Sequence, residues 1–321
     1  MTAAPLPEPF PATRYLIGGI VRRRLHFPHY AGPALRGAFG HALRQLNCIT
    51  GHDDCTGCRA RTACTYAAVF EPPPPPAMHR PRQRIPPPYV LEPPPGAITL
   101  EPGAPFHFGL VLIGPARARL DRVIAALHRA LARDFGGGAV ELTTVQDESG
   151  TRLGKPGGNA PIAPQPAGIV SAPPPRRLDR VALDFVTPIC LRRNGADLDP
   201  ARITARDVLM SAVRRVTDCT ELHLGSQVNA DFSALSQLAA DARCNLALRR
   251  LALNRHSTRQ RRAIPLDGLI GRIELEGTLA PFWPFLHLAQ WLHLGRQTVF
   301  GFGRFTLHAD PRPDLRGDTR A

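Results

Sequence analysis

Histidine is the side chain best suited to proton transfer near neutral pH, and His41 lies in the stretch that predicts the first helix. Pro33 opens this helix, and its apolar residues fall on one face at helical spacing: Leu35, Phe39, Ala42 and Leu46. His41 lies on the opposite face, so we expect it to point away from the core. Gly37 leaves room beside it for a nucleic-acid backbone, and Arg44 reaches the same side of the helix. Without further context, such a histidine is a solvated surface residue.

Four of the seven cysteines lie close together with the spacing C-x6-C-x2-C-x5-C: Cys48, Cys55, Cys58 and Cys64. Two cysteines separated by two residues, as Cys55 and Cys58 are, commonly chelate one metal ion, and four thiolates suit a tetrahedral zinc ion. An iron–sulfur cluster would use the same ligands, and free thiols are the remaining alternative. Because four protein ligands leave no open position, we expect a structural metal and no catalytic one. The other cysteines, Cys190, Cys219 and Cys244, are expected to be small buried apolar residues.

A glycine-rich segment runs from Gly295 to Phe305. Glycines permit positive φ and leave no side chain in the way of a ligand, and successive free N–H groups can bind an anion. The segment follows a helix, so it is neither a Walker loop nor a dinucleotide-binding fingerprint. On its own it would be an ordinary turn.

The chain of 321 residues carries a formal charge of +14, which favours a polyanionic partner, with nucleic acid first and an anionic membrane surface second. The densest basic cluster lies near the middle of the second half: Arg249, Arg250, Arg255, His256, Arg259, Arg261 and Arg262. A solvated face is the default interpretation of such a run. Because almost no acidic residue stands nearby, we expect phosphate contacts instead.

The first half predicts the order β-α-β-β-α-β of a ferredoxin-like domain. Strands are expected over residues 12–25, 89–91, 106–113 and 139–145, and helices from Pro33 and over residues 116–134. An insertion rich in cysteine and proline, about residues 48–88, follows the first helix. Residues 154–178, rich in Pro, Gly and Ala, predict a linker between a domain at 1–153 and a second at 179–321.

The second half repeats the scheme. Strands are expected over residues 179–191, twice within 246–279, and over 299–307, and helices over 204–216, 231–242 and 281–294, with Thr204 as an N-cap. The fold class is therefore α+β, with two tandem ferredoxin-like (RRM-like) domains and a cysteine-rich insertion in the first.

No stretch reaches the ~18 apolar residues that a membrane span needs. The first residues also lack the basic start and apolar run of a signal peptide. We therefore expect a cytoplasmic protein with no membrane partner.

Four stretches resemble the CRISPR-associated endoribonucleases that process precursor CRISPR RNA, members of the repeat-associated mysterious protein superfamily. They are Leu35 to Arg44, Val186-Thr187-Pro188 leading into Leu191 to Gly195, Arg259 to Arg262 leading into Leu269-Ile270-Gly271, and Trp291 to Gly295 running into the glycine-rich segment. Together they span most of the chain, and the C-terminal glycine-rich segment is the hallmark of the superfamily. Its archetypal members lack the cysteine-rich insertion, so the resemblance does not extend to that segment.

The resemblance implies metal-independent cleavage within CRISPR repeat RNA, by attack of a 2′-OH on the adjacent phosphate. It also implies a product ending in a 2′,3′-cyclic phosphate or a 3′-phosphate, and delivery of the guide RNA (crRNA) to proteins of an effector complex. The reaction needs a base, an acid for the leaving 5′-oxygen and positive charge at the phosphate. The family often places a catalytic histidine on the first helix, which matches His41. Tyr30 is then an acid or an RNA-orienting group, and Arg44 binds the phosphate.

RNA contacts are expected from basic residues and glycines in three regions: Arg36, Arg255, Arg259, Arg261, Arg262, Arg296, Gly301, Gly303 and Arg304. Catalytic residues vary within the family, so His26, His29 and His256 compete with His41, and an arginine-dominated site is a further alternative. Two other functions stay open. One is a non-catalytic RNA-binding subunit of a CRISPR effector complex, and the other is a zinc-containing nucleic-acid-binding regulator.

Overall fold

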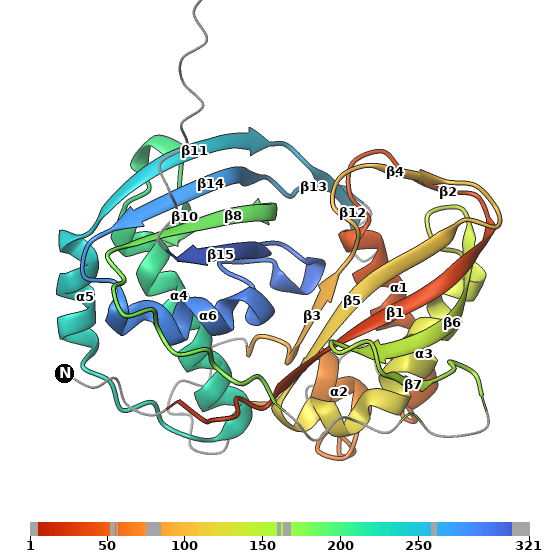
Figure 1. Ribbon diagram of the computed structural model, residues 1–321. Helices are drawn as coiled ribbons and strands as arrows, with labels where there is room; N and C mark the ends of the chain where they lie inside the picture. Colours follow the sequence, from red (N-terminus) through yellow and green to blue (C-terminus); the bar gives the residue numbers. More distant parts are fainter. Residues whose placement is uncertain are drawn as a thin grey trace, which may run out of the picture.

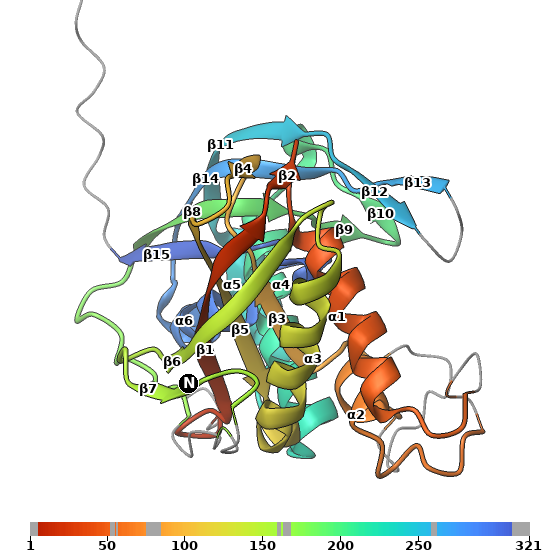
Figure 2. The same ribbon diagram turned by 90° about the vertical axis from the view of Figure 1, so that its right-hand side faces the viewer.

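The computed structural model describes residues 6–51, 55, 57–74, 85–158, 162, 168–257 and 262–309 (Figures 1 and 2). For residues 254–264 the description is limited to the backbone of 254–257 and 262–264. Two antiparallel sheets stand side by side, each with helices packed on one face.

The N-terminal half is built on a sheet with the strand order β3-β5-β1-β6-β7. Its strands are β1 (Ala12–Arg23), β3 (Tyr89–Glu92), β5 (Pro105–Ile113), β6 (Ala139–Asp147) and β7 (Arg152–Gly154). The helices are α1 (Gly32–Asn47), α2 (Thr65–Phe70) and α3 (Leu120–Arg133), of which α1 and α3 lie side by side on the sheet (Figure 2). A short ribbon pairs β2 (Leu25–Phe27) with β4 (Ile98–Leu100).

The C-terminal half is built on a sheet with the order β11-β14-β8-β15. Its strands are β8 (Arg180–Ile189), β11 (Arg243–Leu251), β14 (Gly268–Glu276) and β15 (Phe305–Ala309). The helices α4 (Ala205–Cys219) and α6 (Trp283–Leu292) pack together, and α5 (Phe232–Asp241) lies against α4. Two hairpins, β9 (Arg192–Arg193) with β10 (Ala196–Asp197) and β12 (Asn254–Ser257) with β13 (Arg262–Pro265), project from this half.

Numbered within each half, the four main strands stand in the same spatial order: second, third, first, fourth. Each half also has the chain order β-α-β-β-α-β once the small ribbons and α2 and α5 are set aside, and this is the ferredoxin-like arrangement. The prediction of two tandem ferredoxin-like units is therefore confirmed. The domain boundaries at 153 and 179 stay a prediction.

Amphipathic helices explain the core of each half. The apolar stripe of α3 is fully buried against the sheet: Leu120, Val123, Ile124, Leu127 and Leu131. Each such side chain contributes about 1.5–3 kcal/mol by leaving water. The start of α4 is fixed as predicted, because the Thr204 side chain accepts a hydrogen bond from the backbone N–H of Asp207, and the Asp207 carboxylate accepts one from the backbone N–H of Thr204.

The core of the C-terminal half extends into the N-terminal half. Buried residues at the end of the N-terminal sheet belong to the same apolar cluster as β8, α4 and α6: Phe10, Ala12, Val90, Val111 and Ile113. Part of the expected linker is also anchored, since Phe10 and Ile169 exchange two backbone hydrogen bonds of 2.8 Å. This shared packing fixes the geometry of any site between the halves.

Three local predictions are wrong. Leu46 was expected in the core but is 41% exposed, because the last turn of α1 extends past the sheet and borders the cysteine segment. The expected first strand divides at Arg24 into β1 and β2. The last strand begins at Phe305 and not at Val299, since residues Thr298–Phe300 form a 3₁₀ turn. Within the described part of the chain, no helix is both long and apolar enough to span a bilayer.

Candidate nucleic-acid interface and active site

The glycine-rich segment joins the two halves at the start of α1. Its 3₁₀ turn packs against both α1 and β3. A side chain at Gly32, the first residue of α1, would collide with the carbonyl of Phe300. The ring of Tyr30 packs on Phe302 with the ring centroids 5.7 Å apart. The segment thus holds α1 in place.

The expected anion nest is not formed around Gly301 and Gly303. The backbone N–H groups of Arg296 and of all five residues from Phe300 to Arg304 donate to protein acceptors. Among these, Gly303 donates to the Pro188 carbonyl at 2.8 Å and Arg304 donates to Oγ1 of Thr187 at 2.9 Å. A donor already bonded to protein is not free for a phosphate, so residues 300–304 are an internal connector and not an open cradle, whereas residues 295–300 line a cleft.

Gly301 and Gly303 need correction for the same reason. Both are buried with φ of +87° and +74°, and both face protein. A side chain at Gly301 would meet the Tyr30 hydroxyl and the Leu91 carbonyl at 2.5 and 2.6 Å, and one at Gly303 would collide with the Leu294 carbonyl. Close approach is indeed why these residues are glycines, but the approaching group is the protein itself and not RNA.

Gly303→Ala is therefore expected to destabilise the fold strongly. The left-handed backbone costs about 1–2 kcal/mol for an L side chain, and the overlap adds about 1–3 kcal/mol. Gly195→Ala is the matched control, because Gly195 has φ +82° and nothing within 4 Å of an added Cβ. Urea unfolding would measure both variants. Equal losses for the two would mean that the contact with Leu294 relaxes without cost.

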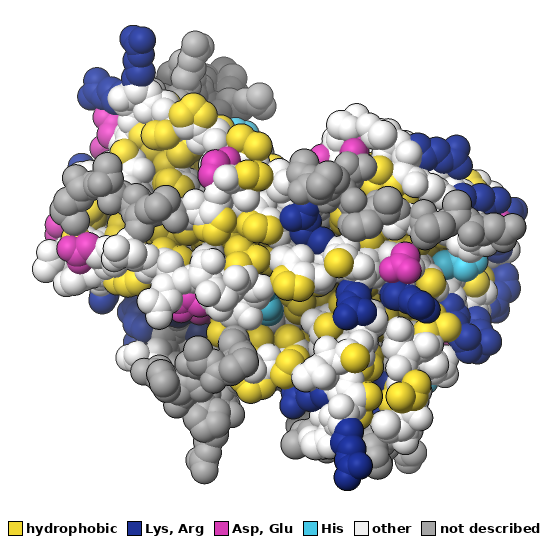
Figure 3. All heavy atoms as spheres, turned by 90° about the horizontal axis from the view of Figure 1, so that it is seen from below, with side chains coloured by type: hydrophobic (Ala, Val, Ile, Leu, Met, Phe, Trp, Pro, Cys, Tyr) yellow, Lys and Arg dark blue, Asp and Glu magenta, His cyan; other side chains and the backbone are white. Residues whose placement is uncertain are grey.

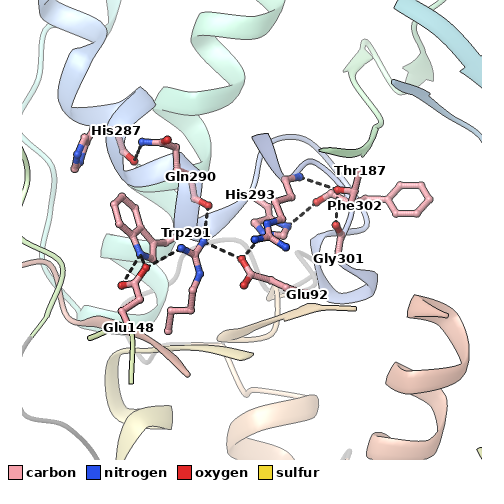
Figure 4. A network of polar contacts seen from close by, with 11 residues as sticks. Glu92, Glu148, Thr187, His287, Gln290, Trp291, His293, Gly301 and Phe302 are labelled. Atoms are coloured by element: carbon pink, nitrogen blue, oxygen red, sulfur yellow. Dashed lines mark hydrogen bonds and ion pairs between the residues drawn. The ribbon is translucent and has the colours of Figure 1, made fainter. Parts of the chain in front are cut away.

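A buried polar network ties the glycine-rich segment to the N-terminal sheet (Figure 4). Glu92 on β3 is 3% exposed, and one of its carboxylate oxygens lies 2.9 Å from the Arg14 guanidinium and 3.0 Å from Nε2 of His293. Nδ1 of His293 lies 3.0 Å from the Phe302 carbonyl. Thr187 donates to the Gly301 carbonyl at 2.6 Å. Residues from both halves thus fix the same loop.

Electrostatics keep Glu92 ionised. Burial raises the pKa of Glu92, but the hydrogen bond with His293 and the charge of Arg14 outweigh it and hold the pKa at about 2. Both ring nitrogens of His293 face acceptors, so both contacts become hydrogen bonds only when the ring carries two protons. Burial opposes that charge and lowers the pKa of His293. Glu92 and His293 are both buried, which makes the pair a support for the loop and not a site for substrate.

The exposed face of α1 carries the predicted catalytic histidine. His41 is exposed, as the helical pattern predicted, and an added side chain at Gly37 would meet nothing within 4 Å. The amide nitrogen of Gln45 lies 2.7 Å from Nε2 of His41. A ring nitrogen that accepts from an amide N–H carries a lone pair, as a general base must. The open space beside His41 suits a ligand backbone.

Tyr30 and Arg44 lie elsewhere than expected. Tyr30 is 9% exposed, its hydroxyl has no hydrogen-bond partner among the described residues, and burial raises its pKa well above the ordinary value. This favours a role in holding the loop over a role as an acid. The Arg44 guanidinium stands 5.9 Å over the Tyr66 ring and donates to the Cys48 sulfur. It therefore points toward the cysteine segment.

The competing histidines divide by position. His29 is exposed just before α1, and His26 is exposed on β2 with Nδ1 3.0 Å from Oγ1 of Thr99. The side chain of His256 lies outside the described residues, as do Arg259 and Arg261. Of Arg255 and Arg262 only the backbone is described, in the hairpin β12-β13.

A large cleft runs between α4, the start of α1 and the glycine-rich segment, with a volume of about 1280 Å³. Seven arginines line it: Arg36, Arg192, Arg193, Arg206, Arg214, Arg215 and Arg296. Only two acidic residues line it, Asp207 and Asp218. Asp207 is paired with Arg193, and burial raises the pKa of Asp218. The cleft is therefore strongly positive, and Figure 3 shows further basic side chains spread over the N-terminal half, on the right of that view.

The cleft arginines differ in their exposure and in the contacts that their guanidinium groups already make with the protein. Arg214 is exposed, and Arg206 is held by Ser236 on α5 at 2.6 Å. Arg215 is buried and donates to the Leu292 carbonyl, while its Nη2 has no partner among the described residues. Arg36 stacks between the rings of Phe70 and Phe300, at 4.2 and 5.5 Å. Arg206 and Arg214 are the readiest to bind phosphate.

The predicted contacts fall partly on this cleft. Arg36 and Arg296 line it, and Arg296 stands 3.6 Å from Asp197. Arg304 is half-buried beside the polar network and does not line the cleft. The sequence interpretation missed Arg206, Arg214 and Arg215, although Arg206 and Arg214 stand about two turns apart on one predicted helix. This spacing places both arginines near one side of the helix, and it could have indicated a basic surface there.

The four clustered cysteines all border one pocket of about 380 Å³ at the end of α1, and none is in a disulfide. Cys48 ends α1, and Cys64 is the N-cap of α2. Cys190 and Cys244 are half-buried and Cys219 is buried. Among the described residues, no three metal-ligating side chains stand at the mutual spacing of one bound ion.

Comparison with known proteins identifies the C-terminal half. Residues 183–305 match the family described as the CRISPR-associated endoribonuclease Cas6, and residues 10–167 match a family described as an N-terminal domain. No curated protein matches the sequence.

Several solved structures share the fold. A Cas6 product complex is 17% identical with a TM-score of 0.56, covering 92% of this chain and 100% of that one. Cas6 of Thermus thermophilus is 14% identical with a TM-score of 0.53, covering 93% and 99%. A chain of a partial Cas6-RT-Cas1–Cas2 complex is 11% identical with a TM-score of 0.58, covering 98% of this chain and 48% of that one. The present chain thus spans about half the length of that last relative. By the family match over residues 183–305 and by its fold, the chain is similar to the CRISPR-associated Cas6 endoribonucleases.

Proposed function

We propose that this protein binds CRISPR repeat RNA in the arginine-lined cleft and cuts it beside the exposed face of α1. The observation that carries the proposal is the cleft itself, in which seven arginines outnumber two acidic residues. α1 contributes Arg36 to the cleft and presents His41 roughly 8 Å further along its axis. The family match and the product complex of a similar fold support RNA as the ligand.

Binding should depend on the phosphate backbone more than on base stacking. Aromatic residues make up 6% of the chain, and none of the described ones lines the cleft except Phe300, which is 5% exposed. Arginine side chains suit phosphate because their planar fork donates two parallel hydrogen bonds. Recognition by shape and charge fits an RNA with a folded repeat.

The cleavage step needs no metal in this proposal. The 2′-oxygen attacks the adjacent phosphorus, its proton passes to Nδ1 or Nε2 of His41, and the bond from phosphorus to the 5′-oxygen breaks as that oxygen takes up a proton. The products are a 2′,3′-cyclic phosphate and a free 5′-hydroxyl. An arginine at the phosphate stabilises the charge of the pentavalent state. Because Tyr30 is buried, we assign it to holding the glycine-rich segment and not to the leaving-group proton.

The guide RNA produced would then pass to proteins of a CRISPR effector complex. The relative whose structure contains Cas6, RT, Cas1 and Cas2 supports the general idea that such a fold works beside other CRISPR proteins. A non-catalytic RNA-binding subunit remains the second candidate. The positions of Tyr30 and of the glycine-rich segment favour this candidate, because both hold the structure together. His41 is then the main group left that is able to move a proton.

The test is cleavage of end-labelled repeat RNA by the purified chain in excess chelator. We expect a single cut and a product that loses mobility after acid opening and phosphatase removal of its cyclic phosphate. Tight binding without a cut would identify a non-catalytic subunit. Preference for duplex DNA over repeat RNA in competition would identify the regulator instead.

A further inference from the structure

We propose that Cys48, Cys55, Cys58 and Cys64 bind one zinc ion, which fastens the insertion after α1 to the helices on either side of it. This site is separate from the RNA cleft and does not depend on the proposed cleavage. The four thiols come from two different backbone settings that meet at one pocket.

The first setting is the pair of helix ends. Cys48 follows the last residue of α1, and Cys64 precedes the first residue of α2, with its carbonyl accepting from Ala68 at 2.9 Å. α2 is itself fixed on α1, because Gly40 makes room for the Phe70 ring. These two thiols are thus held on rigid elements, as a metal site requires.

The second setting is a tight turn. The backbone N–H of Cys58 donates to the Cys55 carbonyl at 3.3 Å, and Gly57 between them has φ +76°. This is a β-turn with glycine at its third position, which brings its first and fourth residues together. Such a turn is how a C-x2-C pair chelates one ion.

The turn and the helix end meet at Thr50. The sulfurs of Cys48 and Cys58 each lie 3.8 Å from the hydroxyl oxygen of Thr50. Backbone N–H groups of Thr50 and Gly51 donate to the Cys48 sulfur. Donors of this kind orient a thiolate ligand. The four sulfurs do not stand at the mutual spacing of one bound ion among the described residues, so metal binding has to draw the cysteine side chains together.

Charge around the pocket also suits a thiolate site. Zinc with four thiolates carries a net charge of −2, and four arginines border the pocket or contact its cysteines: Arg44, Arg61, Arg119 and Arg122. Arg119 donates to the Thr65 hydroxyl at 3.5 Å, at the start of α2. An anionic centre would be stabilised by these cations, whereas four neutral thiols would leave them unbalanced.

The segment also needs a cross-link. The described residues between α1 and α2 form no strand or helix, and its one large apolar residue, Ile49, is 85% exposed. A stretch without a core of its own is stabilised by a metal or a disulfide. With four protein ligands the zinc has no open position, so its role is structural.

The experiment measures metal in the full chain as purified under reducing conditions. We expect about one zinc per chain in the parent and in Cys190→Ser, and less than about a tenth in Cys55→Ser/Cys58→Ser, because folding and binding are coupled at such sites. Removal by a strong chelator should lower Tm, and added zinc should restore it. Cobalt added to the metal-free parent should give thiolate charge-transfer bands and the visible spectrum of a tetrahedral site.

The cobalt spectrum needs no variant, so the proposal stays testable if the double variant does not fold. Parent protein without zinc that also fails to bind zinc or cobalt would overturn it, as would zinc retained in the double variant. Iron and sulfide in equal amounts would identify an iron–sulfur cluster on the same cysteines and reject zinc.

Discussion

His41→Ala should slow cleavage of repeat RNA by about 10²–10⁴-fold while the dissociation constant stays nearly unchanged. A proton shuttle acts in the transition state and adds little to ground-state binding. The side chain is exposed and bonds to Gln45 on the same helix, so its loss should not disturb the core. Single-turnover cleavage and filter binding on the same RNA would separate the two effects.

His29→Ala is the matched control, because His29 is also exposed and lies just before the same helix. It should cleave at nearly the parental rate. RNA with a 2′-deoxy sugar on the 5′ side of the cut should remain intact with the parent, since it has no nucleophile. If His41→Ala cleaves normally while the deoxy RNA stays uncut, the 2′-OH mechanism stands and the base is another residue, with His29 and His256 next. Cleavage of the deoxy RNA would reject the mechanism itself.

Arg206→Ala/Arg214→Ala should weaken binding of repeat RNA by about 10²-fold near physiological salt. A hydrogen bond to a charged group contributes about 1.5–3 kcal/mol. Both arginines line the cleft, where Arg206 donates to the neutral hydroxyl of Ser236. The slope of log K against log salt should fall by about 2, since two phosphate contacts are lost. Titrations at several salt concentrations would measure both quantities.

Arg177→Ala/Arg243→Ala removes the same charge away from the cleft and is the matched control. Both residues are exposed and pair on the surface, with Asp179 at 3.0 Å and Glu276 at 3.7 Å. The control should change the affinity only slightly, through the lower net charge. An equal loss in both double variants, with equal slopes, would mean that the positive field of the whole protein attracts RNA and that the cleft has no special part.

The local sequence by itself determined the elements and several of their details. Apolar spacing predicted the stripe of α3, and the pattern of α1 placed His41 on the solvent side. Thr204 three residues before Asp207 predicted a helix start that the structure forms with a capping box. The order of elements, repeated in both halves, was enough to predict two ferredoxin-like units. These features depend on periodicity and short-range hydrogen bonds, which residues near in sequence decide among themselves.

The tertiary structure alone decided which residues meet across the chain. Glu92 and His293 stand 201 positions apart and form a buried pair, and the cleft collects Arg36, Arg206 and Arg296 from three distant elements. The glycines at 301 and 303 looked like a ligand cradle because positive φ is a local property. Whether their N–H groups and open sides face RNA or protein depends on how the two halves pack. That packing is set by the apolar surface that distant segments bury against each other. A local sequence pattern does not show which distant segment a given apolar face will contact.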